Sequence, residues 1–337
     1  MRVFLVSMVS LLCAIAGPTA LAEGPTMRLG GLFFGDFYRV SKYHLPEAEN
    51  ASGFAFRRIF LTANLNWGDA WSGRARLEAF HKGGFEDYRF THRVQDLWMT
   101  RALGEHQLSL GLLPTPTFID VTEPAWGKRY LLRTPADIHG LPARDLGVSL
   151  KGQLSETHRL SYRLMYGSSE TWEADQNAFD RYMGGVTWRP TDDWLVDIYS
   201  DYEPRPGPYD RQTAQVLVSR STPSSRLTAM ATRQDRDNDP DLELVALMGS
   251  LKLGSNTELI AQIHHLLEPS PKGNAITFIP FDPSAKATNF VAGLEYRIDQ
   301  HFVVTPNIVW TRYEENDEGL TPEDDLQLRL TFFLNFE

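Results

Sequence analysis

DDLQLRLTFFLNF, residues 324–336, alternates apolar and polar side chains over almost its whole length. The even-numbered positions from 326 onward carry leucine or phenylalanine, and the opposite face carries Gln327, Arg329, Thr331, Phe333 and Asn335. Successive side chains of a β-strand point to opposite faces of its sheet. The segment therefore predicts a strand with one lipid-compatible face and one wet face.

The same alternation, bounded by turn residues, recurs along the chain. It predicts about sixteen strands, at 27–42, 54–67, 71–82, 88–103, 106–118, 144–155, 158–168, 181–191, 194–204, 211–222, 225–235, 242–254, 257–268, 287–299, 301–314 and 324–336. The expected fold class is all-β, a transmembrane antiparallel β-barrel. A sealed barrel satisfies every backbone hydrogen bond in hydrocarbon, and one of sixteen strands encloses an aqueous channel.

The connections between the strands alternate in length. Those after even-numbered strands are tight, as at 68–70 and 104–105, whereas those after odd-numbered strands are longer and reach 119–143 and 269–286. This order places short periplasmic turns at one end and long external loops at the other. A soluble one-sided sheet gives similar alternation in a strand or two, but the persistent polar face and the aromatics near strand ends favour the barrel.

The first 22 residues have the composition of a secretory signal peptide, with Arg2, an apolar run over 3–16 and small residues at Ala20 and Ala22. We expect residues 23–337 to form one barrel domain, exported to the outer membrane of a Gram-negative cell. Cys13, the only cysteine, lies in the leader, so neither a disulfide nor thiolate chemistry is expected in the mature chain.

The composition excludes several classes of function. The net charge of −10 disfavours a nucleic-acid partner, because binding a phosphate backbone needs a basic face. No nucleophile elbow or phosphate-binding loop is present, so neither an enzyme nor a cofactor is expected. No metal site is expected either: His264 and His265 are adjacent on a strand and point to opposite faces. The acidic run 235–241 is interpreted as a solvated loop, with weak divalent-cation binding as the lesser alternative.

The polar face of the strands carries charges of both signs. Its basic members are Arg58, Arg74, Arg76, Lys151, Arg163, Arg189, Arg297 and Arg329, and its acidic members are Glu78, Asp145, Asp197, Asp201 and Glu295. Two interpretations stay open. Opposed rows of charge create a transverse field that selects solutes, or the charges pair with neighbours and hold the wall rigid.

The connection 119–143 is apolar and rich in proline. We expect it to fold into the lumen and set a constriction, with a lid over the barrel mouth as the alternative. Its candidate functional residues are Asp120, Glu123, Trp126, Lys128, Arg129, Arg133 and Asp137.

Phe336 resembles the terminal signal read by the barrel-assembly machinery, although Glu337 follows it. A lipid-facing position in the aromatic girdle is compatible with that role.

Three segments resemble the phosphate-selective porin O and P family. They are FRRIFLTANL with WGDAW at 56–71, DLWMTR with LSLGLLPTP at 96–116, and RDLGV at 144–148. The resemblance covers about residues 27–155 and implies a sixteen-stranded, trimeric porin whose third long loop folds inward. Phosphate-selective members use a ladder of Arg and Lys; here the basic residues of the loop 119–143 are offset by its acidic ones, so phosphate selectivity does not follow.

The expected function is a porin for passive diffusion of small hydrophilic solutes or ions, with anions such as phosphate among the candidates. The expected partners are outer-membrane lipid and lipopolysaccharide, the barrel-assembly machinery and two further copies of the chain. Two alternatives remain at this point: a barrel-type outer-membrane enzyme, and a barrel sheath around an electron-transfer partner.

Overall fold

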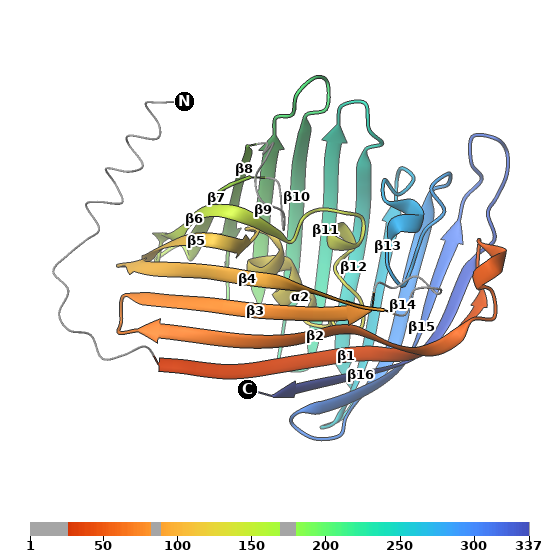
Figure 1. Ribbon diagram of the computed structural model, residues 1–337, viewed down its shortest axis with the longest axis horizontal. Helices are drawn as coiled ribbons and strands as arrows, with labels where there is room; N and C mark the ends of the chain where they lie inside the picture. The colour runs from red at the N-terminus through yellow and green to blue at the C-terminus, as the bar shows by residue number, and fades with distance from the viewer. Residues whose placement is uncertain (1–25, 82–88, 169–179, 337) are drawn as a thin grey trace.

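The computed structural model describes residues 26–81, 89–168 and 180–336. Within these ranges the chain forms one closed barrel of sixteen strands (Figure 1). In chain order they are β1 (Thr26–Lys42), β2 (Ser52–Trp67), β3 (Trp71–His81), β4 (Phe90–Leu103), β5 (His106–Pro114), β6 (Arg144–Ser155), β7 (Leu160–Gly167), β8 (Arg181–Trp188), β9 (Trp194–Glu203), β10 (Arg211–Ser221), β11 (Ser225–Arg236), β12 (Leu242–Lys252), β13 (Thr257–Leu266), β14 (Ala287–Arg297), β15 (Phe302–Tyr313) and β16 (Asp325–Phe336). The predicted fold class is confirmed.

Every strand pairs antiparallel with its neighbours in the chain, and β1 closes the barrel against β16. The closing register runs from Gly31 opposite Phe336 to Lys42 opposite Leu326. No sheet edge is left in the barrel wall, as a span through hydrocarbon requires. Among the described residues, no helix is long and apolar enough to cross a membrane.

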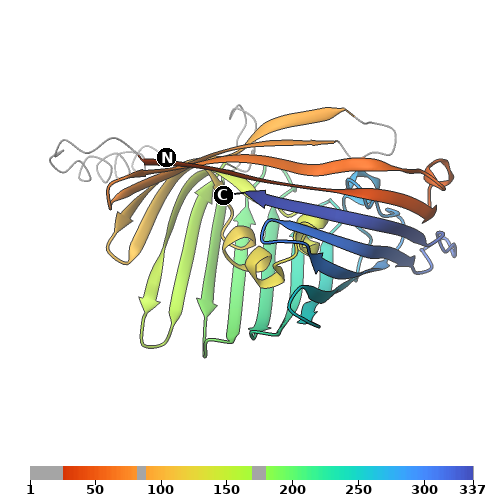
Figure 2. The ribbon, with the colours of Figure 1, turned by 90° about the horizontal axis from the view of Figure 1, so that it is seen from below.

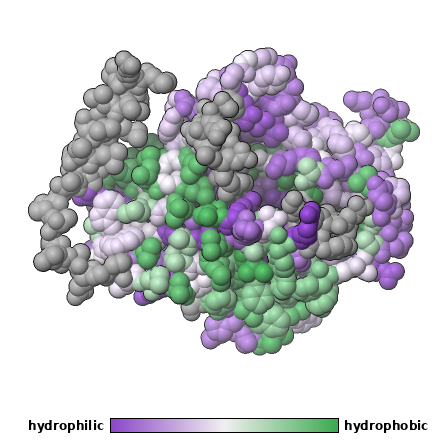
Figure 3. Space-filling view, in the orientation of Figure 1, coloured by the Kyte–Doolittle hydropathy of each residue, from purple (hydrophilic) through white to green (hydrophobic). Residues whose placement is uncertain are grey.

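Polar side chains face the interior of the barrel and apolar ones face outward, the reverse of the distribution in a soluble protein. On β10 and β11 the inward residues are polar and joined across the strands: Gln234 donates to Thr213 at 2.8 Å and Thr232 donates to Gln215 at 3.0 Å. Outward residues such as Val216 are exposed and apolar. Figure 3 shows hydrophobic side chains gathered over the middle of the visible wall and hydrophilic ones toward the long loops. The period-two alternation thus separates a lipid face from a wet interior.

The fifth strand is shorter than predicted. It ends at Pro114 rather than at residue 118. Pro114 and Pro116 lack the backbone N–H that a continuing ladder needs. The chain instead turns across the start of β6, where the backbone N–H of Thr115 donates to the carbonyl of Ala143 at 3.2 Å.

Two long connections enter the barrel. The inward loop, residues 115–143, contains the π-helical turn η2 (Phe118–Thr122) and the short helices α2 (Glu123–Trp126) and α3 (Pro135–Ile138). The second loop, residues 267–286, contains the 3-10 turn η3 (Gly273–Ala275) and buries Ile276, Ile279 and Phe281. Another 3-10 turn, η1 (Pro46–Ala48), lies between β1 and β2. Figure 2 shows α2 and α3 within the ring of strands.

The interior position of the second loop corrects the prediction that all long connections project outward. The second loop lies inside because its apolar residues are buried against the inward loop, and removal of apolar side chains from water lowers the free energy.

Candidate functional site: a constricted channel

The inward loop lies along one side of the lumen because that part of the wall is apolar. The inner faces of β10, β12 and β13 present Leu217, Leu244, Met248 and Ile260, all buried against apolar residues of the loop. β12 is thus apolar on both faces, which is unusual for a strand between lipid and water. The loop covers this surface and leaves the charged wall of β2 to β9 facing the open lumen.

Polar contacts fix the inward loop along this wall. The amide of Gln215 on β10 donates to the hydroxyl of Thr117 at 2.7 Å, and the hydroxyl of Thr228 on β11 donates to the carbonyl of Ala125 at 3.0 Å. Lys128 Nζ lies 2.6 Å from a carboxylate oxygen of Glu295 on β14. These anchors span five strands and hold the loop as a fixed internal partition.

A second set of contacts ties the inward loop to the opposite part of the wall. Arg57 of β2 donates to the carbonyl oxygens of Tyr130 and Leu131, the latter at 2.9 Å. The hydroxyl of Tyr130 donates to Glu295 and lies near Thr305 of β15. The loop therefore bridges the lumen from β10 to β2, which are eight strands apart in the ring of sixteen.

These contacts correct the placement of three predicted pore residues. Trp126 is 1% exposed and donates from its indole N–H to the carbonyl of Leu132 at 2.8 Å. Lys128 and Glu295 pair in the packing between loop and wall. These side chains hold the partition in place and do not line open space, because the loop presses its apolar face and its lysine against the wall.

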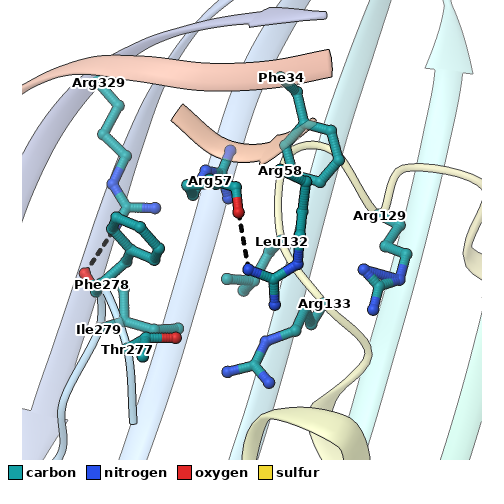
Figure 4. A pocket seen from close by; sticks show the side chains of 10 residues that line it. All are labelled: Phe34, Arg57, Arg58, Arg129, Leu132, Arg133, Thr277, Phe278, Ile279 and Arg329. Carbon is teal, nitrogen blue, oxygen red and sulfur yellow. Dashed lines mark hydrogen bonds between the residues drawn. The ribbon is translucent and has the colours of Figure 1, made fainter. Parts of the chain in front are cut away.

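Five arginines surround the narrow space between the two loops and the wall. We call them the arginine ring: Arg57, Arg58, Arg129, Arg133 and Arg329. Figure 4 shows their side chains around one space, with Phe34, Leu132 and Ile279 beside them. The free volume there is about 30 Å³, enough for about one water molecule. This is a constriction contributed by the wall and by both loops.

A β-bulge supplies two adjacent arginines to the ring. The register of β1 and β2 shifts between Phe34 and Gly35, so Arg57 falls between paired residues and points inward together with Arg58. Gly35 is needed at this point, since a Cβ there would lie 2.2 Å from the carbonyl oxygen of Ala55. Strict alternation places Arg57 on the lipid face, and the bulge that turns it inward has no clear signal in the sequence.

The ring carries more positive than negative charge. In the described part of the chain, Asp36 pairs with Arg57 and Arg329, Asp96 with Arg76 and Arg144, and Asp137 with Arg129 and Arg133. Glu78 pairs with Arg58 and Arg93, and Glu123 pairs with Arg129. The five arginines of the ring thus share four carboxylates within ion-pair distance, and one of these, Glu78, is also shared with Arg93.

Electrostatics within the inward loop reflect this excess. Burial alone would raise the pKa of Asp137, but Arg133 and Arg129 outweigh it and lower that pKa. Burial lowers the pKa of Arg133, and the positive charge of Arg129 adds to that effect against the attraction of Asp137. Asp137 therefore stays ionised, and the guanidinium groups beside it remain incompletely compensated.

The other predicted pore residues line the wall in pairs. Arg74 donates to Asn64 at 2.9 Å, Lys151 lies 3.3 Å from Asp120, and Arg163 lies 2.5 Å from Asp197. Asp145 and Asp201 are buried on the inner face of β6 and β9. Arg297 lies 3.7 Å from Glu295 near the short-turn end.

Arg189 lies in a wide vestibule at the short-turn end of the lumen. Together with Lys151, Arg163 and Asp120 it borders a space of about 430 Å³. The vestibule is more than ten times the volume of the space inside the arginine ring.

A buried histidine pair joins the two loops to the wall. His139 Nε2 lies 3.0 Å from His264 Nε2 on β13, and His139 Nδ1 lies 2.8 Å from Ser270 Oγ of the second loop. Burial holds the pKa of His139 well below its usual value, and the neighbouring His264 and the positive charges of Arg133 and Lys272 lower it further. His265 points the other way and contacts Thr288, as adjacent strand positions require.

Phe336 lies on the outer surface at the end of β16, opposite Gly31. This position fits an aromatic girdle residue. Its role as an assembly signal stays a prediction.

Comparison with known proteins identifies the architecture. No family model matches the chain, and no curated protein matches it. Among solved structures, the outer membrane channel DcaP of Acinetobacter baumannii superposes with a TM-score of 0.67 and 13% identity, covering 96% of this chain and all of that one. The anion-selective porin from Comamonas acidovorans gives 0.63 and 13%, covering 93% and 100%.

A mutant of the Rh. blastica porin gives a TM-score of 0.60 and 12% identity, covering 92% of this chain and all of that one. At such identities the likeness concerns the fold, and the resemblance to the phosphate-selective family is not decided by it. The chain has the sixteen-stranded closed-barrel fold of the outer-membrane porins.

Proposed function

We propose that this chain is a passive outer-membrane channel for small hydrophilic solutes, with a preference for anions. The observation that supports the proposal is the arginine ring around the small space between the two loops and the wall, where five arginines share four carboxylates. An uncompensated positive charge in a confined space lowers the energy of an entering anion and raises that of a cation.

The excess of positive charge is confined to the arginine ring. The whole chain is acidic, with a net charge of −10, so its overall charge would favour cations. Selectivity in a pore follows the charges that line the constriction, because salt screens distant charges over roughly 10 Å. The solved structures that share the fold include one whose name describes it as anion-selective. Phosphate belongs to the class of solutes that we propose, without a preference over other small anions.

Both interpretations of the charged inner face apply, each to different residues: some charges select solutes, and others pair with neighbours and stabilise the wall. Arg163 with Asp197 is a closely paired wall contact, whereas Arg58 and Arg133 border free space in the ring. We assign the selecting role to the ring and a supporting role to the paired wall residues.

Reversal potentials across a planar bilayer with a potassium chloride gradient test the anion preference. Arg133→Gln removes one charge from the ring, and we expect the anion-to-cation permeability ratio to fall about fivefold, as an interaction of about 1 kcal/mol requires. Arg233→Gln is the matched control, because its side chain is 61% exposed and pairs outside the lumen with Asp235 and Glu243. Equal ratios for both variants would contradict the assignment.

We further propose that residues 1–22 direct export, that the barrel lies among outer-membrane lipid and lipopolysaccharide after insertion by the assembly machinery, and that three copies associate. A phenylalanine patch supports the last point: Phe33, Phe37, Phe54, Phe56 and Phe332 contact one another on the outer face of β1, β2 and β16. Aromatic side chains are favoured at protein interfaces. One solved structure with this fold is described as a trimer form.

A further inference from the structure

A backbone carbonyl of the second loop lies against the arginine ring. Arg329 Nη2 donates to the carbonyl oxygen of Phe278 at 2.8 Å, and Gln327 Nε2 donates to the same oxygen at 3.2 Å. Figure 4 shows Arg329 and Phe278 joined at the edge of the space that the other arginines border. Both donors come from the inner face of β16, so the wall itself holds the tip of the loop.

A guanidinium and an amide that converge on one oxygen atom are the donors with which proteins recognise oxyanions. A peptide carbonyl carries only a partial negative charge and is the weaker acceptor of the two. The ring also has donor capacity left over: Arg329 Nη1 and Arg129 Nη1 are buried and donate no hydrogen bond to any described residue. Buried donors without partners are uncommon in proteins and are expected to be satisfied by a ligand or by water.

The docked loop also contains strained backbone. Phe278 has a φ of 68°, in the left-handed region. Bulky side chains rarely adopt this conformation, because the Cβ atom then lies too close to the backbone carbonyl oxygen. The docked state of the second loop is therefore stabilised by the two hydrogen bonds and by its apolar contacts, and opposed by its own backbone.

We propose that Arg329 and Gln327 form an oxyanion subsite that the carbonyl of Phe278 occupies, and that a small oxyanion displaces this carbonyl and releases the second loop. The inference rests on the proposed anion channel and adds a mechanism of opening. In the docked state the carbonyl of Phe278 already takes the position that an oxyanion oxygen would need between Arg329 and Gln327. An oxyanion therefore enters only as the loop withdraws, and its charge replaces the contact that the carbonyl loses.

The accessibility of Ile279 tests this displacement. Ile279 adjoins Phe278 and is buried in the docked loop. Cys13 is the only cysteine of the chain, so Cys13→Ser with Ile279→Cys leaves one thiol. The full chain, reconstituted in lipid vesicles, is treated with a neutral maleimide in chloride and in inorganic phosphate at equal ionic strength. We expect phosphate to accelerate labelling at least severalfold and in a saturable manner.

Gln327→Leu in the same background keeps every arginine but removes one donor to the carbonyl and the oxygen that accepts from Arg329 Nε at 3.1 Å and Nη2 at 2.6 Å. It is expected to accelerate labelling at least fivefold in chloride alone, as the loss of a net hydrogen bond to the carbonyl implies. Gln300→Leu is the matched control, because Gln300 contacts His301 in a short turn. This control is expected to label at the parent rate. If Ile279→Cys does not yield a folded barrel, Thr277→Cys, which also borders the ring, reports the same motion.

Equal labelling in phosphate and chloride would overturn the proposal, and so would acceleration by phosphate without any effect of Gln327→Leu, since phosphate would then act elsewhere. Reversal potentials of the same preparations distinguish failure of the displacement from failure of the proposed anion channel. Anion preference with unchanged labelling rejects only the displacement, whereas cation preference rejects the proposed function itself.

Discussion

Lys128 of the inward loop lies between two carboxylates of the barrel wall, with its Nζ 2.6 Å from Glu295 and 2.7 Å from Glu258, although 167 and 130 residues separate these partners in the chain. The lysine and Glu295 are largely buried. A paired charge in such a position determines where the loop can lie, because any other placement removes both loop partners of the buried Glu295, Lys128 and Tyr130, and leaves it only Arg297 at 3.7 Å.

Replacing Lys128 with Met should destabilise the protein. The substitution removes the ammonium group beside the buried carboxylate of Glu295, which keeps only the hydroxyl of Tyr130 and Arg297 at 3.7 Å, and we expect the free energy of unfolding to fall by about 3 kcal/mol. Urea denaturation followed by tryptophan fluorescence measures this change. Lys151→Met serves as the control, since Lys151 is 41% exposed and pairs with Asp120 at 3.3 Å. We expect it to cost less than about 1 kcal/mol. Similar losses in the two variants would argue against the anchoring role.

Deletion of residues 124–138 should widen the channel. These residues include most of α2, all of α3 and the arginines at 129 and 133, which border the narrow space. With the partition removed, the ring and its bridge across the lumen are lost, and single-channel conductance should rise severalfold. Heat-modified mobility in gels checks that the deleted protein still forms a barrel. A folded deletion variant with the conductance of the parent would show that the loop sets no constriction.

Stability should decrease with rising pH through the titration of His44. Its ring lies 2.8 Å from Asp325 of β16 and 2.7 Å from Asn274 of the second loop. Burial lowers the pKa of His44, but the hydrogen bond and the charge of Asp325 outweigh burial and raise it above 6.5. Its contribution is therefore complete below the unfolded pKa and is lost as pH rises through the folded pKa.

The measurement is the free energy of unfolding between about pH 5 and about pH 9. His44→Gln should reduce the decline of the free energy of unfolding with rising pH. His158→Gln, in an exposed short turn, should leave that decline unchanged. An identical decline in the parent and in His44→Gln would show that this histidine does not contribute.

The phenylalanine patch should govern association of the barrels. Phe37 is 55% exposed and lies 4.7 Å from Phe54, whose ring stacks on Phe332. Phe37→Ala removes the most exposed ring and should lower the temperature at which the trimer dissociates, as light scattering in detergent would report. Leu247→Ala on the distant strand β12 is the control, because Leu247 is also exposed to lipid. A patch that contacts lipid alone would give the same result for both variants.

The sequence predicts the fold well because period-two alternation and turn residues act locally. The start of β6 at Arg144 and the span of β3 from Trp71 agree with the prediction to within a residue or so. The prediction extends the fifth strand too far because the apolar pattern continues past Pro114. The backbone leaves the sheet there because proline lacks an N–H donor.

The candidate site was less predictable because it depends on packing between distant segments. Arg57 reaches the lumen only through a bulge, and the second loop enters it because Ile276 and Phe281 pack against the inward loop. Trp126 and Lys128 were assigned to the constriction from composition alone, but the direction in which a loop side chain points is set by the wall that it meets. The apolar inner face of β12, at Leu244 and Met248, was a signal of that docking surface.

The central claim is that the barrel encloses a water-filled path whose narrowest part favours anions. Single-channel recording of the purified protein in a planar bilayer with a potassium chloride gradient tests it most directly. We expect discrete conductance steps with a reversal potential displaced toward the equilibrium potential of chloride. A bilayer that stays silent after verified insertion, or a reversal potential near that of potassium, would contradict the account.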